Sequence, residues 1–355
     1  MAKKKVVYVE PADYFPKELR EKYKLGEFSE MAQKRKLEYL IKSVMFGHAV
    51  GDALGVPVEF CDRKELDKNP VVDMRGFGTY PYPAGTWSDD TSMSLCALEA
   101  MTHDDWNTST VMDNFVKWLL NDEFTPTGET FDVGHTCFDA IMNYHLHKLP
   151  PRECGGLGEH SNGNGSLMRI HPFVLYGYAK KIRDFDWLAL IDTASALTHA
   201  HERSKIACLI YGTVFNFIMM EPTKDKVREG IKFACDDFDY MDEFIHYSRL
   251  ADLNFEHLSR DEIKSSGYVV DTLEAALWCL LTTDTYKECV LKAVNLGGDT
   301  DTIAAIAGGL AGALYGYDAI PEEWLNTLAK REYIEELCES TGWILSNDNF
   351  GASKW

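Results

Sequence analysis

Residues 295–316 read NLGGDTDTIAAIAGGLAGALYG, and the second half of this stretch is the strongest constraint on the fold. A helix over residues 303–314 carries only isoleucine, alanine, glycine and leucine, so it has no face suited to water. A helix of this kind has to be covered on all sides by other parts of the chain. We therefore predict a helix over residues 299–316 that lies at the centre of the fold.

Helix-type spacing of apolar residues recurs along most of the chain, while the alternation typical of strands is almost absent. This pattern predicts an all-α protein. The predicted helices cover residues 29–50, 89–101, 109–120, 134–146, 166–180, 187–197, 202–219, 224–235, 269–281, 285–293, 299–316 and 323–339, the last with a break. No segment of 20–50 residues repeats, which argues against a solenoid.

The length and the cysteine usage indicate an intracellular protein that folds without disulfides. At 355 residues the chain can bury a core without disulfides or structural metals. Its apolar runs are shorter than the roughly 20 residues of a membrane span, and the apolar stretch near the start ends at Glu10 and Pro11, too early for a signal peptide. The nine cysteines form no C-x-x-C pair. We expect a reduced, cytoplasmic protein with no membrane partner.

Charge is distributed unevenly between the start of the chain and the rest. The formal net charge is -20, but residues 1–36 carry ten Lys and Arg against six Asp and Glu, which gives +4 there and -24 elsewhere. The acidic body argues against nucleic acid as a partner. We predict an N-terminal extension over residues 1–36, one domain over residues 37–345 and a C-terminal tail over residues 346–355. The extension is either a simple tail or an arm that binds a partner.

The segment GTWSDDTS places Ser88 where the N-cap of a helix belongs, with Asp89 and Asp90 in the first turn. One interpretation is capping, because carboxylates near a helix N-terminus stabilise it by about 0.3–1 kcal/mol. The other is a metal site. The residues of this segment alone favour capping.

The segment GGDTDT repeats the arrangement with Asp299, Asp301 and Thr302 in front of the buried helix. Neighbouring buried carboxylates repel one another, and a divalent cation removes that cost. Because both clusters contain carboxylate and hydroxyl oxygens without Cys or His, they suit Mg²⁺, Mn²⁺ or Ca²⁺ and not Zn²⁺. The D-x-D-x-T motif of haloacid-dehalogenase-type phosphatases would need threonine where Ile303 stands, and an EF-hand would need glutamate where Leu310 stands.

A glycine-rich loop, SNGNGSLMRIHPF, precedes the helix predicted to begin at Ser166. Its candidate ligand-binding residues are Asn162, Gly163, Asn164, Gly165, Ser166, Met168 and Arg169. Glycines allow a ligand to approach the backbone, and free N–H groups at a helix start bind phosphate. The alternative is an ordinary turn with asparagine in left-handed geometry. Both interpretations stay open at this point.

Four further polar or aromatic residues are candidates, each with a structural alternative. Glu59 ends GDALGVPVEF and is either at a site or on the surface of a turn. Asp132 is either a site acid or the N-cap of the helix opening near Gly134. His199 in LTHAH is more often a hydrogen-bonded structural residue than a ligand. Tyr268 precedes a helix and could stack on a ligand or belong to the core.

Five segments in this order resemble the ADP-ribosylglycohydrolase family: GDALGVPVEF, GTWSDDTSMSL, NGNGSLMRIHPF, LTHAH, and GYVVDTLEAALWCLL running into AVNLGGDTDTIAAIAGGLAGALYG. The resemblance covers about residues 37–340. It implies a single, orthogonally packed all-α domain with a two-metal cleft that holds Mg²⁺ or Mn²⁺. It also implies hydrolysis of the bond between C1″ of ADP-ribose and a protein side chain.

The resemblance assigns roles to particular residues. The matching metal ligands are Ser88, Asp89, Asp90, Asp299, Asp301 and Thr302, where many members have threonine at the position of Ser88. The catalytic acids would be Glu59, Asp89, Asp90 and Asp301. The loop from Asn162 to Arg169 would hold the diphosphate and ribose, and Asp132, His199 and Tyr268 would line the same pocket.

The acceptor to which ADP-ribose is attached stays open, with arginine as our first expectation because similar bacterial members act on it. Some bacterial members are immunity proteins that neutralise ADP-ribosylating toxins. The basic extension therefore makes an ADP-ribosyltransferase toxin an alternative partner, besides an ADP-ribosylated protein substrate. Other relatives of this fold are lens crystallins with degraded sites, but this chain keeps all six predicted ligands.

Overall fold

The computed structural model describes residues 37–103, 105–238, 241–252 and 254–346. Within these ranges the protein is one all-α domain without strands, as predicted. Its α-helices are α3 (Leu37–Gly55), α4 (Arg63–Lys68), α5 (Asp89–Ala100), α6 (Thr108–Asn121), α7 (His135–His147), α8 (His171–Ala179), α9 (Asp184–Ala196), α10 (Glu202–Met220), α11 (Lys224–Asp237), α12 (Val269–Leu281), α13 (Tyr286–Val294), α14 (Thr300–Tyr315), α15 (Glu322–Thr327) and α16 (Arg331–Ser346). Short 3₁₀ helices are η2 (Val56–Val58), η3 (Pro151–Glu153), η4 (Asp242–Ala251), η5 (Phe255–His257), η6 (Arg260–Glu262) and η7 (Tyr317–Ala319).

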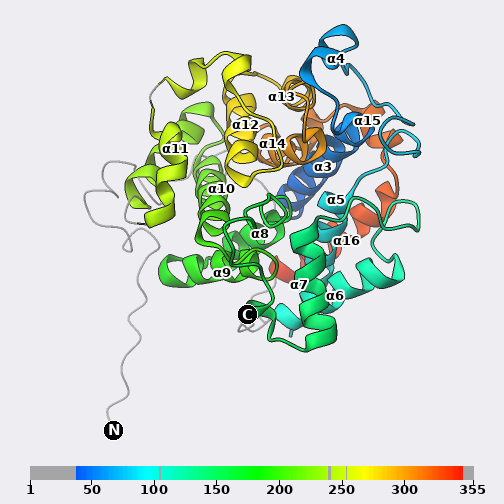
Figure 1. Cartoon of the computed structure of the whole chain (residues 1–355), viewed down its shortest axis with the longest axis vertical. Helices are drawn as coiled ribbons and strands as arrows, with labels where there is room; N and C mark the ends of the chain where they lie inside the picture. The colour runs from blue at the N-terminus through cyan, green and yellow to red at the C-terminus, as the bar shows by residue number, and fades with distance from the viewer. Residues whose placement is uncertain (1–36, 104, 239–240, 253, 347–355) are drawn as a thin grey trace.

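Helices α3 and α14 lie side by side at the centre of the molecule (Figure 1). Every residue of α14 from Thr300 to Leu314 is buried, which confirms the central helix predicted from its apolar sequence. Glycines let the two helices touch backbone to backbone. A Cβ atom added at Gly51 would stand 2.1 Å from the Ala304 carbonyl oxygen, and one at Gly308 would stand 2.2 Å from the Gly47 carbonyl oxygen. This close approach fixes the ends of the two helices relative to each other.

The remaining helices surround this central pair. Helices α12 and α13 pack on α14, and α10 joins them to α9 and α11 on one side of the molecule (Figure 1). Helices α5, α6, α7 and α16 lie on the other side, where α16 packs against both α3 and α5. None of the described helices has the length and apolarity that a membrane crossing requires.

The helix predicted to begin at Ser166 begins five residues later, at His171. Pro172 stands in its first turn, where a residue without an N–H donor fits, whereas the same proline inside a longer helix would clash with the preceding turn. Residues 166–169 instead form turns, one of which is closed by the Met168 N–H donating to the Asn164 carbonyl oxygen. The prediction of a helix start at Ser166 is therefore wrong.

Other boundaries also differ from the prediction, since α3 continues to Gly55, beyond the predicted residue 50. The predicted break in the last helix separates α15 from α16, and α16 continues to Ser346, beyond the predicted residue 339. The short helix α4 and the 3₁₀ helix η4 were not predicted. The predicted extension over residues 1–36 lies outside the described residues, as does the predicted tail apart from Ser346.

Candidate functional site

The first acidic segment lies at the N-terminus of α5. Ser88 is the N-cap, and its hydroxyl accepts a hydrogen bond from the Asp90 N–H at 3.3 Å. Capping is therefore real here, but it uses the serine and not the two aspartates. Asp89 and Asp90 are both buried, so their side chains are not the solvated first-turn acids that capping alone would place there. Asp90 Oδ1 instead accepts from the Thr302 hydroxyl of α14 at 3.3 Å.

Asp52, which the sequence analysis did not single out, supports this turn from α3. Its carboxylate accepts from the Ser88 N–H at 2.9 Å and from the Thr91 hydroxyl at 2.6 Å. Asp52 is fully buried, and burial raises the pKa of its carboxyl to about 7. The signal in the sequence was a lone acid inside the otherwise small and apolar segment GDALG.

The second acidic segment lies at the N-terminus of α14. Gly297 and Gly298 have φ values of +75° and +77°, a left-handed conformation that favours glycine, and they turn the chain into the helix. Asp299 occupies the N-cap position without making a side-chain capping bond. Asp301 is buried in the first turn, where one of its oxygens accepts from the Thr302 N–H at 2.9 Å.

Glu59 and Asp132 come from two loops that meet this helix end. Glu59 is only 5% exposed, so the turn-surface interpretation of this residue is wrong. Asp132 is not an N-cap, because Gly134 holds that position in α7. Its backbone is left-handed, with φ of +56°, and its carboxylate accepts from the Tyr80 hydroxyl at 2.8 Å.

Asp301 connects two groups of carboxylates. Oxygen atoms of Asp52, Asp90 and Asp301 lie within 4.8 Å of one another, and so do oxygen atoms of Glu59, Asp132 and Asp301. The three helix ends and two loops therefore converge on one acidic centre with Asp301 in the middle.

The electrostatics of this centre are unfavourable without a cation. Burial, together with the charges of Asp132 and Asp299, raises the pKa of the Glu59 carboxyl to about 9. Burial and neighbouring carboxylates likewise raise the pKa of Asp89, Asp90 and Asp301 well above the ordinary value. In the part of the chain that the structure describes, no lysine or arginine forms an ion pair with any of these acids.

Several carboxylate oxygens of this centre lack a hydrogen-bond partner among the residues described, and this bears on whether the residues fit a metal. One oxygen each of Glu59, Asp90, Asp299 and Asp301 is buried and has no hydrogen-bond partner in the described residues. Leaving such an oxygen unpaired costs roughly 1–3 kcal/mol or more for a charged group. Carboxylate and hydroxyl oxygens are the ligands that Mg²⁺ and Mn²⁺ prefer. The donor set therefore fits hard divalent cations.

A cleft of about 470 Å³ opens over the acidic centre. Of the residues predicted to bind metal or act as acids, it exposes Glu59, Asp89, Asp299 and Thr302. Ser88, Asp90 and Asp301 are not part of its lining. Residues of the cleft wall that the sequence analysis missed include His135, Cys137 and His160, which carry no motif of their own.

The glycine-rich loop forms the opposite wall of the cleft. Of its predicted ligand-binding residues, Gly163, Asn164, Gly165 and Met168 line the cleft, together with His199 and Asp132. Asn162, Ser166, Arg169 and Tyr268 do not line it. Ser166 is buried, and its hydroxyl accepts from the Ser195 hydroxyl at 3.0 Å.

Backbone pairing joins the glycine-rich loop to the segment before α12. Gly163 and Tyr268 form an antiparallel bridge, in which the Asn164 N–H donates to the Gly267 carbonyl oxygen at 3.1 Å. Within the described residues, the N–H groups of Gly163 and Gly165 find no acceptor. Two free donors on the cleft wall favour the binding of an anion, although they do not belong to a helix start as predicted.

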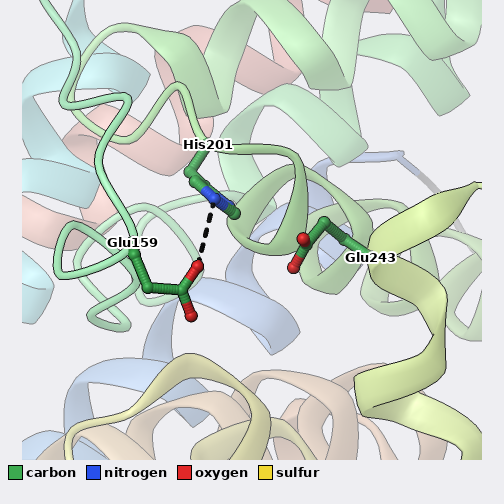
Figure 2. A group of neighbouring side chains, drawn as sticks. All are labelled: Glu159, His201 and Glu243. Atoms are coloured by element: carbon green, nitrogen blue, oxygen red, sulfur yellow. Dashed lines mark ion pairs between the residues drawn. The ribbon is translucent and has the colours of Figure 1, made fainter.

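A second group of metal-ligand type lies beside this loop. Figure 2 shows Glu159 and Glu243 on either side of His201, with the Glu159 carboxylate 3.7 Å from the His201 ring nitrogen Nε2. The buried Arg203 already pairs with both acids, at 2.8 Å to Glu159 and 2.6 Å to Glu243. We therefore interpret this group as an ion-pair cluster. The Arg203 guanidinium also lies 5.8 Å from the centre of the Tyr268 ring, so the cluster supports the outer edge of the bridge.

Comparison with known proteins agrees with this geometry. The family model described as ADP-ribosylglycohydrolase matches residues 33–349. An ADP-ribosylarginine hydrolase, Tri1, of Serratia proteamaculans (strain 568) is 33% identical over 310 residues, which cover 87% of this chain and 80% of the relative. The ADP-ribosyl-[dinitrogen reductase] glycohydrolase of Rhodospirillum rubrum is 33% identical over 285 residues, covering 79% of this chain and 87% of the relative.

A solved structure is similar along nearly its whole length. The structure titled ADP-ribosylglycohydrolase-related protein complex superposes with a TM-score of 0.73 at 30% sequence identity. The match covers 88% of this chain and 99% of that chain.

Proposed function

The chain belongs to the ADP-ribosylglycohydrolase family, and on this basis we propose that it removes ADP-ribose from arginine side chains of modified proteins with the help of two divalent cations. The observation that carries the proposal is the acidic centre beneath a cleft whose other wall offers free backbone donors. The arginine linkage is favoured because relatives at 33% and 31% identity are named ADP-ribosylarginine hydrolases.

The residues that would hold the cations are Ser88, Asp89, Asp90, Asp299, Asp301 and Thr302. The unpartnered oxygens of Asp90, Asp299 and Asp301 support this assignment. Asp301 would be the central ligand of this set, because its carboxylate oxygens lie within 4.8 Å of those of Asp90 and of Glu59. When bound, Mg²⁺ or Mn²⁺ supplies positive charge that polarises ligand oxygens and lowers the pKa of water.

Residues of the chain itself would transfer the proton, bind the diphosphate and hold the acids in position. Glu59 lines the cleft with a buried, unpartnered Oε2, so this oxygen would take and return the proton during hydrolysis. The free N–H groups of Gly163 and Gly165 would bind the diphosphate, because backbone donors suit phosphate oxygens. Asn164 would hold Asp299 in place through its side-chain amide. Asp132, whose carboxylate lies within 4.8 Å of that of Glu59, would hold the Glu59 side chain in place.

The test uses two substrates, one protein ADP-ribosylated on arginine and one on serine. We expect the purified chain with Mg²⁺ to release ADP-ribose from the arginine-linked substrate, and a chelator to stop the release until Mg²⁺ is restored. Asp301→Asn should abolish release, whereas Asp186→Asn, an exposed acid on α9, should not change it. Release from serine alone would overturn the arginine assignment, and no release from either substrate would overturn the proposed activity.

The alternative of an immunity protein depends on residues 1–36, which lie outside the described residues. It therefore stays an alternative. A variant without residues 1–36 would test it, because loss of binding to an ADP-ribosyltransferase toxin with retained hydrolysis would support a separate binding role. Unchanged binding would rule out the predicted arm.

A further inference from the structure

Arg169 is completely buried but has no acidic partner. Its NH2 group donates to the Thr198 hydroxyl at 2.7 Å and to the Ala194 carbonyl oxygen at 3.0 Å, and its guanidinium lies 5.0 Å from the centre of the Phe115 ring. Among the described residues it forms no ion pair, and two of its nitrogens have no hydrogen-bond partner. A buried guanidinium without an acidic partner is costly, so its one hydrogen bond to a described side chain, that of Thr198, needs a reason.

The Thr198 hydroxyl lies between Arg169 and His199. It is fully buried, and its oxygen is 2.9 Å from the His199 ring nitrogen Nδ1. An arginine can only donate, so Thr198 has to accept from Arg169. The single hydroxyl proton of Thr198 is then left for another acceptor. His199 Nδ1 is a stronger acceptor than the thiol sulfur of Cys137, which also lies beside this hydroxyl.

We propose that Arg169 and Thr198 are positioning residues that fix His199 in the tautomer with its proton on Nε2, so that the ring presents an N–H donor to a diphosphate oxygen in the cleft. This inference rests on the proposed function for the identity of the ligand. The direction of each hydrogen bond in this chain is then set, from the Arg169 guanidinium to the Thr198 hydroxyl and from the hydroxyl to His199 Nδ1.

The other side of the ring faces the glycine-rich loop. His199 lines the cleft, and a Cβ atom added at Gly163 or Gly165 would stand 3.6 Å or 3.4 Å from its Nε2. Nε2 has no hydrogen-bond partner within the described residues. The donor therefore lies next to the free N–H groups of Gly163 and Gly165, where an acceptor-only phosphate oxygen could meet all three.

His199 also stays neutral in this setting. Burial, aided by the charge of Arg169, lowers the pKa of its imidazole to about 3. A ring that does not gain a second proton at neutral pH can donate through only one nitrogen. Which nitrogen carries the proton therefore decides whether the ring attracts or repels a phosphate oxygen.

The first test reads the tautomer directly, in the whole protein without substitutions. NMR of ¹⁵N-histidine-labelled protein, with the His199 signal identified by its loss in His199→Asn, should show a protonated Nε2 and an unprotonated Nδ1. A protonated Nδ1 would overturn the proposal. This measurement does not depend on hydrolysis, so it separates the tautomer from the proposed function.

The second test measures the affinity for ADP-ribose by calorimetry. Thr198→Val keeps the shape of the side chain but removes the hydroxyl, and we expect it to weaken binding about fivefold, as the loss of one hydrogen bond predicts. Thr198→Ser should restore the affinity and the tautomer. The matched control is Thr193→Val, because the Thr193 hydroxyl is buried nearby without a partner in the described residues. Unchanged affinity and tautomer in Thr198→Val would overturn the proposal, whereas a wild-type protein with the expected tautomer but no affinity for ADP-ribose would overturn the assignment of the ligand.

Discussion

The side-chain amide of Asn164 donates a hydrogen bond to Asp299 Oδ2 at 2.8 Å, and this contact joins the glycine-rich loop to the N-terminus of α14. The same amide nitrogen lies 3.0 Å from the Thr272 hydroxyl. One residue thus connects both walls of the cleft, and its substitution tests how far the two walls depend on each other.

Asn164→Ala should lower kcat/KM about tenfold, because a hydrogen bond to a charged group contributes roughly 1.5 kcal/mol or more. Asn164→Asp should be more damaging, since it adds a like charge beside Asp299. The control is Asn326→Asp, an exposed amide on α15. If Asn164→Asp is no worse than Asn164→Ala, the loop and α14 are not electrostatically coupled as described.

Divalent cations should stabilise the folded protein, because a ligand that binds only the native state raises the free energy of unfolding. We expect Mg²⁺ or Mn²⁺ to raise the Tm in differential scanning fluorimetry. Asp301→Asn should abolish this rise, since Asp301 belongs to both groups of acids. Asp186→Asn on α9 should show the full rise. A Tm that does not respond to either cation in the wild type would contradict the metal assignment.

Gly51→Ala should destabilise the fold by roughly 2 kcal/mol or more, because its new methyl group would stand 2.1 Å from a carbonyl oxygen of α14. Denaturant unfolding measures the change. Gly158→Ala is the control, since its methyl group would meet only the Ser161 hydroxyl at 3.7 Å. Equal stability of the two variants would show that α3 and α14 can separate at little cost.

Glu274→Gln should stabilise the protein at pH 8 but not at pH 4. Glu274 is buried on α12, and burial raises the pKa of its carboxyl to about 7, although Arg249 lies 3.4 Å away. Between pH 4.5 and 7 the unfolded chain loses this proton while the folded chain keeps it, so the free energy of unfolding falls as the pH rises. The expected gain at pH 8 is on the order of 2 kcal/mol. Thermal unfolding across this pH range measures this gain in stability, with Glu332→Gln at an exposed position as the control. A gain of the same size at pH 4 and pH 8 would contradict burial of the charged carboxylate as its cause.

Arg203→Lys should raise KM about fivefold with little change in kcat, because a single ammonium cannot pair with both Glu159 and Glu243 and no longer supports Tyr268. The matched control is Arg228→Lys, because the exposed Arg228 of α11 pairs in a comparable way with two acids, Asp225 of α11 and Glu256 of η5. A fall in kcat without a change in KM would show that Arg203 acts on the acidic centre and not on the edge of the cleft.

The sequence predicted the features that depend on local chemistry. The apolar run after Asp299 indicated a central helix, and hydroxyl and carboxylate residues at two helix starts indicated the acidic centre. What could not be predicted depends on contacts between distant segments. Glu59 and Asp132 had surface or capping interpretations that only their burial and backbone geometry overturn. Asp52 was missed because its partners Ser88 and Thr91 are more than thirty residues away.

The glycine-rich loop is a second case in which the sequence predicted a role but not the backbone structure. Its composition predicted ligand binding, but the predicted start of α8 lies five residues before the observed one. The apolar pattern extends across Pro172, whereas this proline has to stand in the first turn of the helix. As a result the free donors of the loop come from backbone turns paired with residues 267 and 268, and not from a helix end.

The glycine contacts between α3 and α14 have a consequence for how such a protein can change. The acids carried by the two helices are held in register by main-chain atoms, so their spacing does not depend on the side chains of the cleft wall. The loops that carry His160, Gly163 and Tyr268 lie outside these main-chain contacts, although Asn164 bonds to Asp299. Substitutions in these loops, apart from Asn164, can therefore change the cleft wall while the spacing of the acids on α3 and α14 stays the same.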